Sequence, residues 1–272
     1  MIKKVYLIVN PKKDPEGKNR EEIIRLLESK GIGYVEPAGE IDPDDARICD
    51  AVFTVGGDGT LIQAARELRS LDIPFFPINI GTLGYLTEST MATADKDLDR
   101  LIAGDYRIQE RMRIAGTMPD GTVMTALNDV VIIRRESLHI VRLNLYINDK
   151  LVHTYRADGI IVSTSTGSTG YNLAAGGAIL EPESKMMIVT PICPHTVRLT
   201  SLVVSDSDEL KIEFLPGHEP DLTVVAGFDG GEMHPLQEGE SVSVRRAEEK
   251  TKLIRFEDDS FLDVLYKKMK EN

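Results

Sequence analysis

Residues 56–60, Gly-Gly-Asp-Gly-Thr, set one carboxylate among three glycines, after the apolar run 51–55 and before a helical pattern. Glycine lets a ligand approach the main chain, and the free N–H groups at the start of a helix favour an anion. The spacing therefore predicts a phosphate-binding turn. Its predicted phosphate contacts are Gly56, Gly57, Gly59 and Thr60. It is not a Walker A loop, because no Lys-Ser/Thr pair follows, and a GxGxxG fingerprint would need glycine at Ile62.

Asp58 requires an explanation, because a carboxylate repels phosphate. A positioned base would take the proton from a hydroxyl that attacks phosphorus, and such a base contributes ~10²–10⁴-fold to the rate. The alternative is a tight strand–helix connection in which Asp58 is a simple N-cap. The strand–turn–helix context of the five residues favours the base.

A second stretch, 163–169, is Ser-Thr-Ser-Thr-Gly-Ser-Thr and carries no charge. Its composition alone is typical of a flexible linker. However, an apolar strand pattern precedes it and Tyr-Asn-Leu-Ala-Ala-Gly-Gly follows it, so we expect a binding loop. Its hydroxyl and N–H groups suit ribose and phosphate oxygens, the Tyr171 ring suits stacking, and Arg156 suits a phosphate.

Asn128 and Asp129 are a third pair of candidate ligands, at the start of the apolar run 130–133. Their side chains could hold a ribose diol or an adenine edge. An ordinary Asn-Asp turn before a strand explains the same residues equally well.

The composition excludes several classes of function. Among 272 residues, 44 acidic against 32 basic side chains give a net charge of −12, which argues against a nucleic-acid partner. No apolar run approaches the ~18 residues of a membrane span, so we expect no membrane partner and a cytoplasmic protein. Cys49 and Cys193 lie too far apart in sequence to indicate a metal pair or a disulfide framework.

Two patterns of secondary structure divide the chain. Up to about residue 105, the buried-strand candidates 5–9, 51–55 and 73–78 alternate with helical patterns, which predicts a parallel sheet. Afterwards, alternating apolar residues and hairpin signals predict an antiparallel sandwich. Its expected strands include 141–147, 210–214, 241–246 and 252–256, with a hairpin turn at 148–150. Helical spacing returns from Phe261 to Met269.

We therefore predict an α/β nucleotide-binding domain over 1–105 and a β-rich domain over 106–257. A final helix within 258–272 is expected to pack back on the first domain.

Taken together, the motifs resemble the ATP-dependent NAD kinase family over nearly the whole chain. The matching strings are GGDGT at 56–60, GTLGYL at 81–86, LNDV at 127–130, RADG at 156–159, TGSTGYN at 166–172 and FDGG at 228–231. The resemblance implies a Rossmann-like N-terminal domain and an all-β sandwich-like C-terminal domain, and it makes the β-rich domain over 106–257 the NAD-binding domain. It implies that ATP phosphorylates NAD⁺ to NADP⁺, with Mg²⁺ carried on the ATP and no dedicated metal ligands in the protein.

The resemblance also implies roles for individual residues. Asp58 would activate the 2′-hydroxyl of the adenosine ribose, and Gly59 would touch both ATP and NAD⁺. Asn128 and Asp129 would hold the adenosine half, and Asp158 the nicotinamide amide. The remaining implied NAD⁺ contacts are His139, Arg156, Thr166, Thr169, Gly170, Tyr171 and Asn172. A half-buried strand histidine explains His139 equally well.

Some residues depart from the family pattern. Asp129 stands in place of a glutamate and Ser165 in place of a proline, while Gly170 replaces an alanine and Gly231 a longer residue. Loss of the proline is expected to loosen the loop through chain entropy.

Two other functions remain open from the sequence, a lipid kinase with the GGDGT motif and a non-catalytic NAD-binding sensor. The resemblance further implies a homodimer or homotetramer.

Overall fold

The computed structural model describes residues 2–82, 84–87, 89–135, 139–195, 201–216, 223–256 and 261–271. The chain forms two compact units. Unit 1 comprises Met1–Arg111 and Thr251–Asn272, and unit 2 comprises Met112–Lys250.

Unit 1 is built on a parallel sheet in the order β2-β1-β3-β4, and both β5 and the end of β17 pair with β4 in parallel. This confirms the predicted strand–helix alternation. Its strands are β1 (Lys4–Val9), β2 (Gly33–Val35), β3 (Ala51–Gly56), β4 (Pro74–Asn79) and β5 (Ser89–Thr90). Its helices are α1 (Lys18–Ser29), α2 (Pro43–Arg47), α3 (Asp58–Glu67), α4 (Ala94–Ala103) and α6 (Phe261–Glu271).

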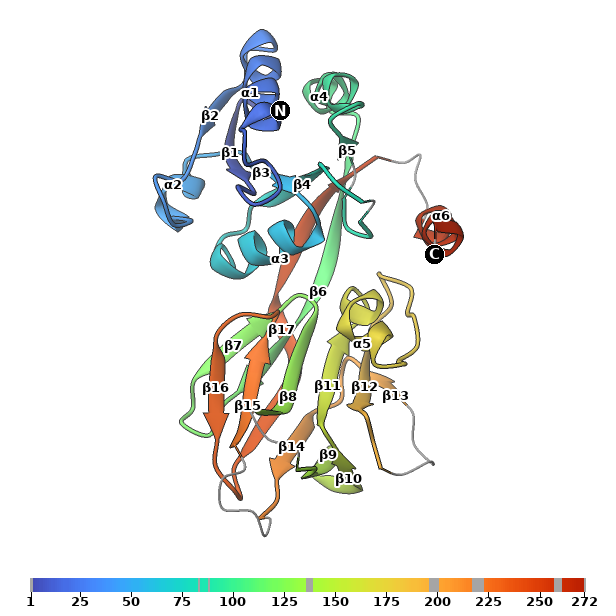
Figure 1. The fold of residues 1–272 in the computed structure, drawn as a ribbon. Coiled ribbons are helices and arrows are strands. Elements are labelled where there is room, and N and C mark those ends of the chain that lie inside the picture. The colour runs from blue at the N-terminus through green and yellow to red at the C-terminus, as the bar shows by residue number, and fades with distance from the viewer. Residues whose placement is uncertain are drawn as a thin grey trace. The chain divides into compact units, whose positions relative to one another are not determined.

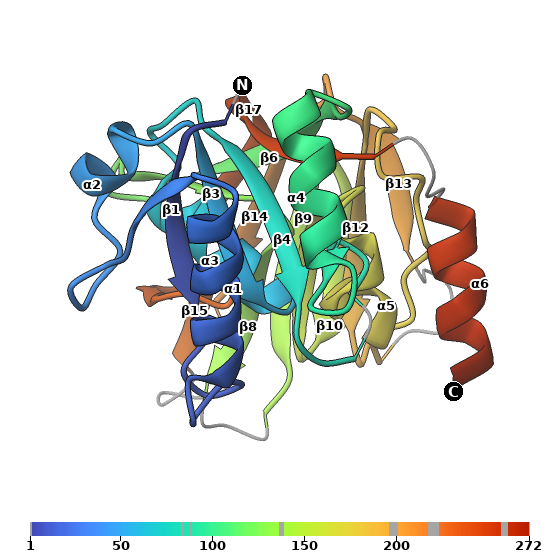
Figure 2. The same cartoon turned by 90° about the horizontal axis from the view of Figure 1, so that it is seen from above.

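Helices α1 and α4 lie on one face of this sheet, and α3 lies on the other (Figure 1; Figure 2). Alternate strand residues such as Leu7 and Phe53 share a buried cluster with Leu27 of α1 and Leu98 of α4. Helix α3 begins at the carboxyl end of β3, which is where ligands bind in open α/β sheets.

The last helix returns to unit 1, as the sequence predicts. The rings of Tyr85 and Phe261 lie 6.4 Å apart, and the Lys268 ammonium lies 4.3 Å from the centre of the Tyr85 ring. Among the described residues, no helix is both long enough and apolar enough to cross a bilayer.

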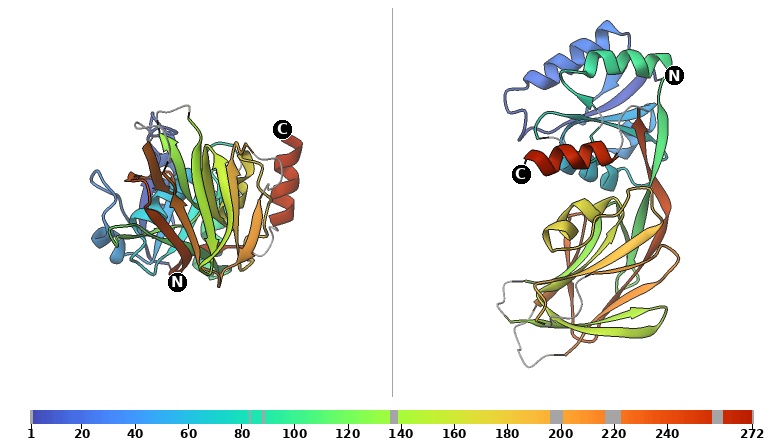
Figure 3. Two further views of the ribbon diagram at one scale, coloured as in Figure 1. Left: turned by 90° about the horizontal axis from the view of Figure 1, so that it is seen from below. Right: turned by 90° about the vertical axis from the view of Figure 1, so that its right-hand side faces the viewer.

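Unit 2 is a sandwich of two antiparallel layers (Figure 3). One layer has the order β10-β9-β14-β17 and the other β13-β12-β11-β8-β15-β16, with a shared apolar core between them. Two of its strands extend beyond this unit, since β6 begins and β17 ends in unit 1. The strands are β6 (Arg107–Thr117), β7 (Val123–Ala126), β8 (Asp129–Arg135), β9 (Val141–Ile147), β10 (Lys150–Ala157), β11 (Gly159–Thr164), β12 (Met186–Ile192), β13 (Leu202–Ser205), β14 (Leu210–Phe214), β15 (Thr223–Phe228), β16 (Met233–Leu236) and β17 (Ser241–Arg255). The short helices are η1 (Gly167–Thr169) and α5 (Tyr171–Ala174).

Two details test the expected strands. Asn148 and Asp149 adopt positive φ angles of 48° and 62°, so the predicted β9–β10 hairpin turn is confirmed. The separate strands expected at 241–246 and 252–256 are instead one strand, β17. It pairs with β14 through Ser241–Val244 and with β4 through Lys252 and Leu253, and its charged middle, which resembles a loop in sequence, stays extended.

Candidate active site

The glycine turn of unit 1 joins β3 to α3. β3 ends at Gly56, Gly57 occupies the N-cap position without a capping side chain, and α3 starts at Asp58. A Cβ at Gly56 would collide with the Thr60 side chain, so the turn requires glycine there. The Thr60 hydroxyl accepts hydrogen bonds from Asn10 Nδ2 at 2.9 Å and from the Gly57 N–H at 3.4 Å. It therefore serves the turn itself, and its contact with phosphate stays a prediction.

Asp58 is held by backbone N–H groups from another loop. Its Oδ2 accepts from the Tyr85 N–H at 2.7 Å, and its Oδ1 accepts from the Leu86 N–H at 3.1 Å. The simple N-cap interpretation is wrong, because Asp58 is the first helical residue and its side chain makes no capping bond. The carboxylate is half-buried, and each of its oxygens has a second lone pair with which to accept a proton.

The loop after β4 is shaped to deliver those N–H groups. Asn79 Nδ2 donates to the carbonyls of Gly81 and Thr82 at 3.3 and 2.9 Å, and the Gly81 N–H donates back to Asn79 Oδ1 at 3.0 Å. A Cβ at Gly84 would collide with the Asp58 carboxylate. The motif at 81–86 therefore positions Asp58, although its Leu83 lies outside the described residues.

In unit 2, a second carboxylate, Asp229, organises the segment before β8. It accepts N–H groups from Leu127 at 2.6 Å, Asn128 at 2.7 Å and Asp129 at 3.1 Å. Burial, together with the neighbouring Asp229 charge, raises the pKa of Asp129 to about 7. Burial also raises the pKa of Asp229, against the effect of the three N–H donors. Asp229 lies in the FDGG string, but nothing in the sequence around it indicates this role.

The hydroxyl-rich stretch is an ordered part of unit 2, so the flexible-linker interpretation is wrong. Its residues 163–168 are buried, and the stretch continues into η1 and α5 at the end of β11 (Figure 1). The Thr164 hydroxyl donates to the Leu127 carbonyl at 2.6 Å, and a Cβ at Gly167 would collide with the Asn128 backbone. The structure therefore brings the stretch together with Asn128.

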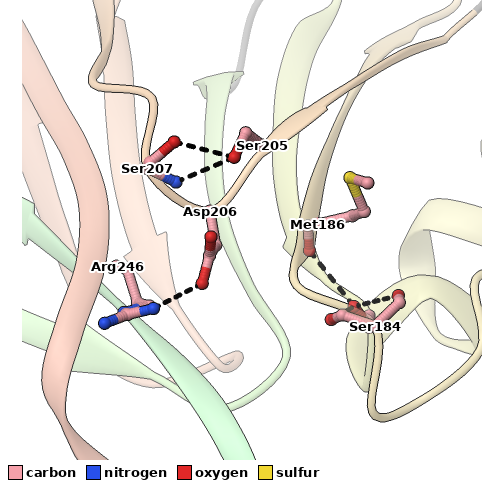
Figure 4. Close-up of polar contacts among 7 residues, drawn as sticks. Ser184, Met186, Ser205, Asp206, Ser207 and Arg246 are labelled. Carbon is pink, nitrogen blue, oxygen red and sulfur yellow. Dashed lines mark hydrogen bonds and ion pairs between the residues drawn. The ribbon is translucent and has the colours of Figure 1, made fainter.

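Ser165, at the position where the resemblance leads us to expect a proline, anchors this stretch through its hydroxyl. The Ser165 Oγ lies 2.7 Å from the Ser184 carbonyl, 2.9 Å from the Ser184 hydroxyl and 3.1 Å from the Met186 carbonyl. Figure 4 shows Ser184 and Met186 at this anchor, and the ion pair of Asp206 with Arg246 elsewhere in unit 2. The serine thus supplies contacts that offset the greater freedom of a chain without proline.

Asp158 lies at the other end of β11 from the hydroxyl-rich stretch. It pairs with Arg134, whose Nε lies 2.9 Å from Asp158 Oδ1 and whose N–H donates to the Asp158 carbonyl at 3.0 Å. The register of β11 with β8 runs from Ser163 opposite Asp129 to Gly159 opposite Ile133, a span of roughly 13 Å. An extended dinucleotide can bridge such a span.

Tyr171 lies within electrostatic range of both ends of this span. Burial raises the pKa of its hydroxyl, and the nearby Cys193, Asp129 and Asp158 add to that effect. The residue is still 43% exposed, so a ligand can reach it.

The other predicted NAD⁺ contacts differ in their surroundings. Asn172 is fully buried, with its amide donating to the Ser168 and Ala178 carbonyls and accepting from the Thr190 hydroxyl.

Thr166 is buried, Thr169 and Gly170 are half-exposed, and Arg156 is exposed. A Cβ at Gly170 would lie 3.5 Å from Asn128 Nδ2. His139 is exposed in a bend before β9, so its interpretation as a half-buried strand residue is wrong.

Comparison with known proteins identifies the family of this chain. Residues 127–256 match the ATP-NAD kinase C-terminal domain, and residues 36–106 match the ATP-NAD kinase N-terminal domain. The chain belongs to the ATP-NAD kinase family. Its activity is the ATP-dependent phosphorylation of NAD. The lipid-kinase and sensor alternatives are thereby excluded.

Relatives within the ATP-NAD kinase family match the chain over nearly its whole length. The NAD kinase of Lachnospira eligens is 37% identical over 293 residues, covering 98% of this chain and all of the relative. The NAD kinase of Moorella thermoacetica is 36% identical over 283 residues, covering 99% of this chain and 90% of the relative.

Two solved structures confirm the fold. Yeast NADH kinase complexed with NADH superposes with a TM-score of 0.85 at 21% identity, covering 100% of this chain and 88% of that one. An NAD kinase from Archaeoglobus fulgidus in complex with ATP gives 0.83 at 22% identity, covering 99% of each chain.

Proposed function

We propose that Asp58 is the general base of the kinase reaction. The 2′-hydroxyl oxygen of the adenosine ribose forms a bond to the γ-phosphorus of ATP, and the bond from that phosphorus to the β–γ bridging oxygen breaks. The hydroxyl proton passes to Asp58, and the products are NADP⁺ and ADP. The observation that carries this assignment is the half-buried carboxylate fixed by the Tyr85 and Leu86 N–H groups.

The glycine turn receives the phosphates of ATP. Phosphoryl transfer depends mainly on alignment and on neutralising charge, and main-chain N–H groups at the start of a helix such as α3 can contribute to both. Gly57 and Gly59 lie in this first turn, and a Cβ at Gly59 would meet open space. An approaching phosphate would therefore meet no side chain at Gly59.

NAD⁺ is recognised by unit 2. Asn128 and Asp129 hold the adenosine half at one end of the β8–β11 span, Asp158 binds the nicotinamide amide at the other, and Tyr171 stacks along the dinucleotide. Thr166, Thr169 and Gly170 shape the pocket. Asn172 acts by holding α5 in place, because its amide is occupied within the protein. Arg156 and His139 remain assigned to NAD⁺ on the resemblance alone.

Mg²⁺ fits this chain as an ion carried by ATP. Among the described residues, no three His, Cys, Asp or Glu side chains gather into a metal site. Mg²⁺ usually binds through one or two carboxylates and substrate phosphates, so a site built from three protein side chains is not required. When bound, the ion neutralises charge on the phosphates. We assign it no dedicated protein ligand.

The assembly is a homodimer or homotetramer in this proposal. The sandwich layers end at β10 and β13, and these edge strands expose Leu151 (50%), Val152 (43%) and Val203 (43%). Exposed apolar edge strands favour pairing with another chain. Light scattering at several protein concentrations measures the mass, and a monomer throughout would contradict the proposal. The cytoplasmic location stays a prediction of the sequence.

The site of phosphorylation is tested on the product. We expect purified protein with NAD⁺ and ATP-Mg to form a product that an NADP-specific dehydrogenase reduces, with a single phosphomonoester in its ³¹P NMR spectrum. A monophosphorylated product that the dehydrogenase ignores would place the new phosphate on another hydroxyl and contradict the assignment. NADH, GTP and polyphosphate in parallel reactions define the acceptor and donor range.

A further inference from the structure

The loop after β1, Asn10–Asp14, carries a lysine directly above the glycine turn. A Cβ at Gly57 would lie 2.6 Å from the Lys13 Nζ, and a Cβ at Gly81 would lie 3.3 Å from the same atom. Gly57 belongs to the turn after β3 and Gly81 to the loop after β4. The Lys13 ammonium therefore reaches both segments that surround Asp58, and the two glycines leave the space that it occupies.

Asn10 holds the start of this loop against α3. Its Nδ2 donates to the Thr60 hydroxyl at 2.9 Å, and its Oδ1 accepts the Lys12 N–H at 3.0 Å. The Asn10 carbonyl accepts the Lys13 N–H at 3.1 Å. The backbone of Lys13 is thus fixed relative to the first turn of α3.

Asp14 holds the end of the loop against α1. It is buried and accepts the backbone N–H groups of Asn19 at 3.2 Å and Arg20 at 2.9 Å. Lys13 therefore lies between two anchored neighbours, and only its long side chain remains free to adjust.

The Lys13 ammonium has no protein partner in the described part of the chain. Neither a hydrogen bond nor an ion pair joins it to another described residue, and the side chain is exposed. An ammonium has three donors and no acceptor, so it is ready for an anion. Because the side chain is exposed, an anion can approach the ammonium from solvent.

We propose that Lys13 binds the terminal phosphates of ATP and neutralises charge on the transferred phosphoryl group. This inference rests on the proposed assignment of the glycine turn to ATP. Lys13 forms and breaks no bond. It adds a positive charge beside a turn whose only side-chain charge is the negative Asp58. The loose transition state of phosphoryl transfer carries negative charge on the transferred group, and a positive charge beside it is stabilising.

The test compares Lys13→Ala with Lys12→Ala, its exposed neighbour in the same loop. We expect Lys13→Ala to lower kcat/KM for ATP by about tenfold to a hundredfold, because one charge-assisted donor to the transferred group is lost. KM for NAD⁺ and the Kd of NAD⁺ by calorimetry should stay within about twofold. Lys12→Ala should match the wild type, and Lys13→Arg should recover part of the activity.

Each other outcome contradicts the inference. Unchanged kcat/KM for ATP in Lys13→Ala, or a weakened KM for NAD⁺ with ATP kinetics intact, would remove Lys13 from the donor phosphates. An equal loss in Lys12→Ala would indicate general electrostatic attraction. Asp58→Asn in the same assay separates the two proposals: a loss there with full activity in Lys13→Ala leaves the base assignment standing and ends this one.

Discussion

The glycine turn of unit 1 and the Asn128 segment of unit 2 share one kind of hydrogen bonding, which serves a different purpose in each. In both, a carboxylate accepts backbone N–H groups from a distant segment: Asp58 from Tyr85 and Leu86, Asp229 from residues 127–129. Both carboxylates are half-buried, but Asp229 accepts three N–H groups and lies beside the buried Asp129, and burial raises the pKa of Asp229. The same bonding therefore holds the proposed base in unit 1 and organises the segment that carries Asn128 in unit 2.

The sharpest test of this contrast is Asp58→Asn. We expect kcat to fall by at least ~10²-fold, because the amide cannot take the hydroxyl proton. NAD⁺ binding by calorimetry should remain, since its proposed contacts lie mainly in unit 2. Asp50→Asn is the matched control, because Asp50 also accepts two backbone N–H groups in unit 1, from Lys3 and Lys4. Equal turnover in both variants would remove Asp58 as the base.

The pair of Asp129 and Asp229 in unit 2 predicts a pH dependence of stability. The pKa of Asp129 is about 7 in the folded chain, against about 3.9 when unfolded. Between these values the unfolded chain has lost the proton that the folded chain keeps. The free energy of unfolding therefore falls by a few kcal/mol as pH rises from 4 to 7, and this contribution is constant above 7.

Asp129→Asn should flatten that decline, as measured by urea unfolding at a series of pH values. Asp206→Asn, which removes a surface ion pair with Arg246, should leave the slope as it is. A wild-type curve that rises steadily from pH 4 to 7, unchanged in Asp129→Asn, would show that Asp129 is ionised throughout.

Asp229→Asn distinguishes a structural role of Asp229 from a role in the reaction. An amide cannot accept all three N–H groups, so we expect a loss of about 1.5–3 kcal/mol in the free energy of unfolding. The pKa of Asp129 should fall because the neighbouring charge is gone, but it should stay raised because burial, the larger cause, remains. NAD⁺ affinity should weaken, while kcat at saturating NAD⁺ changes less than in Asp58→Asn. The opposite pattern, with stability intact and kcat abolished, would make Asp229 a chemical participant.

These two regions also show what the sequence could predict. The glycines at 56, 57 and 59 have a local signature, and so do the strands and the hairpin turn at 148–149. The partners of the two carboxylates have none, because backbone N–H groups are present at every non-proline residue. Tyr85 lies 27 residues from Asp58, and Leu127 lies 102 residues from Asp229. Only the fold selects these donors, and the position of Lys13 above Gly57 depends on it equally.

The same limit explains the outcome for individual binding residues. Thr166 and Asn172 belong to one motif and suggest one role, yet the Asn172 amide is occupied by Ser168, Ala178 and Thr190. A polar side chain in a binding motif looks alike in sequence whether it faces a ligand or the interior. Burial decides between the two, and burial depends on residues far away in the chain.

Tyr171→Ala should have the smallest effect of these substitutions, and it tests whether the exposed Tyr171 ring binds substrate. The Tyr171 side chain is 43% exposed at the start of α5. If it stacks on the dinucleotide, its removal should weaken NAD⁺ binding by ~1–3 kcal/mol, with kcat nearly unchanged and KM for ATP unaffected. Tyr171→Phe should keep most of the affinity, because the ring face supplies the contact. Tyr266→Ala removes another exposed ring, in unit 1, and should change neither constant. An unaltered KM for NAD⁺ in Tyr171→Ala would mean that unit 2 holds the dinucleotide through its polar groups alone.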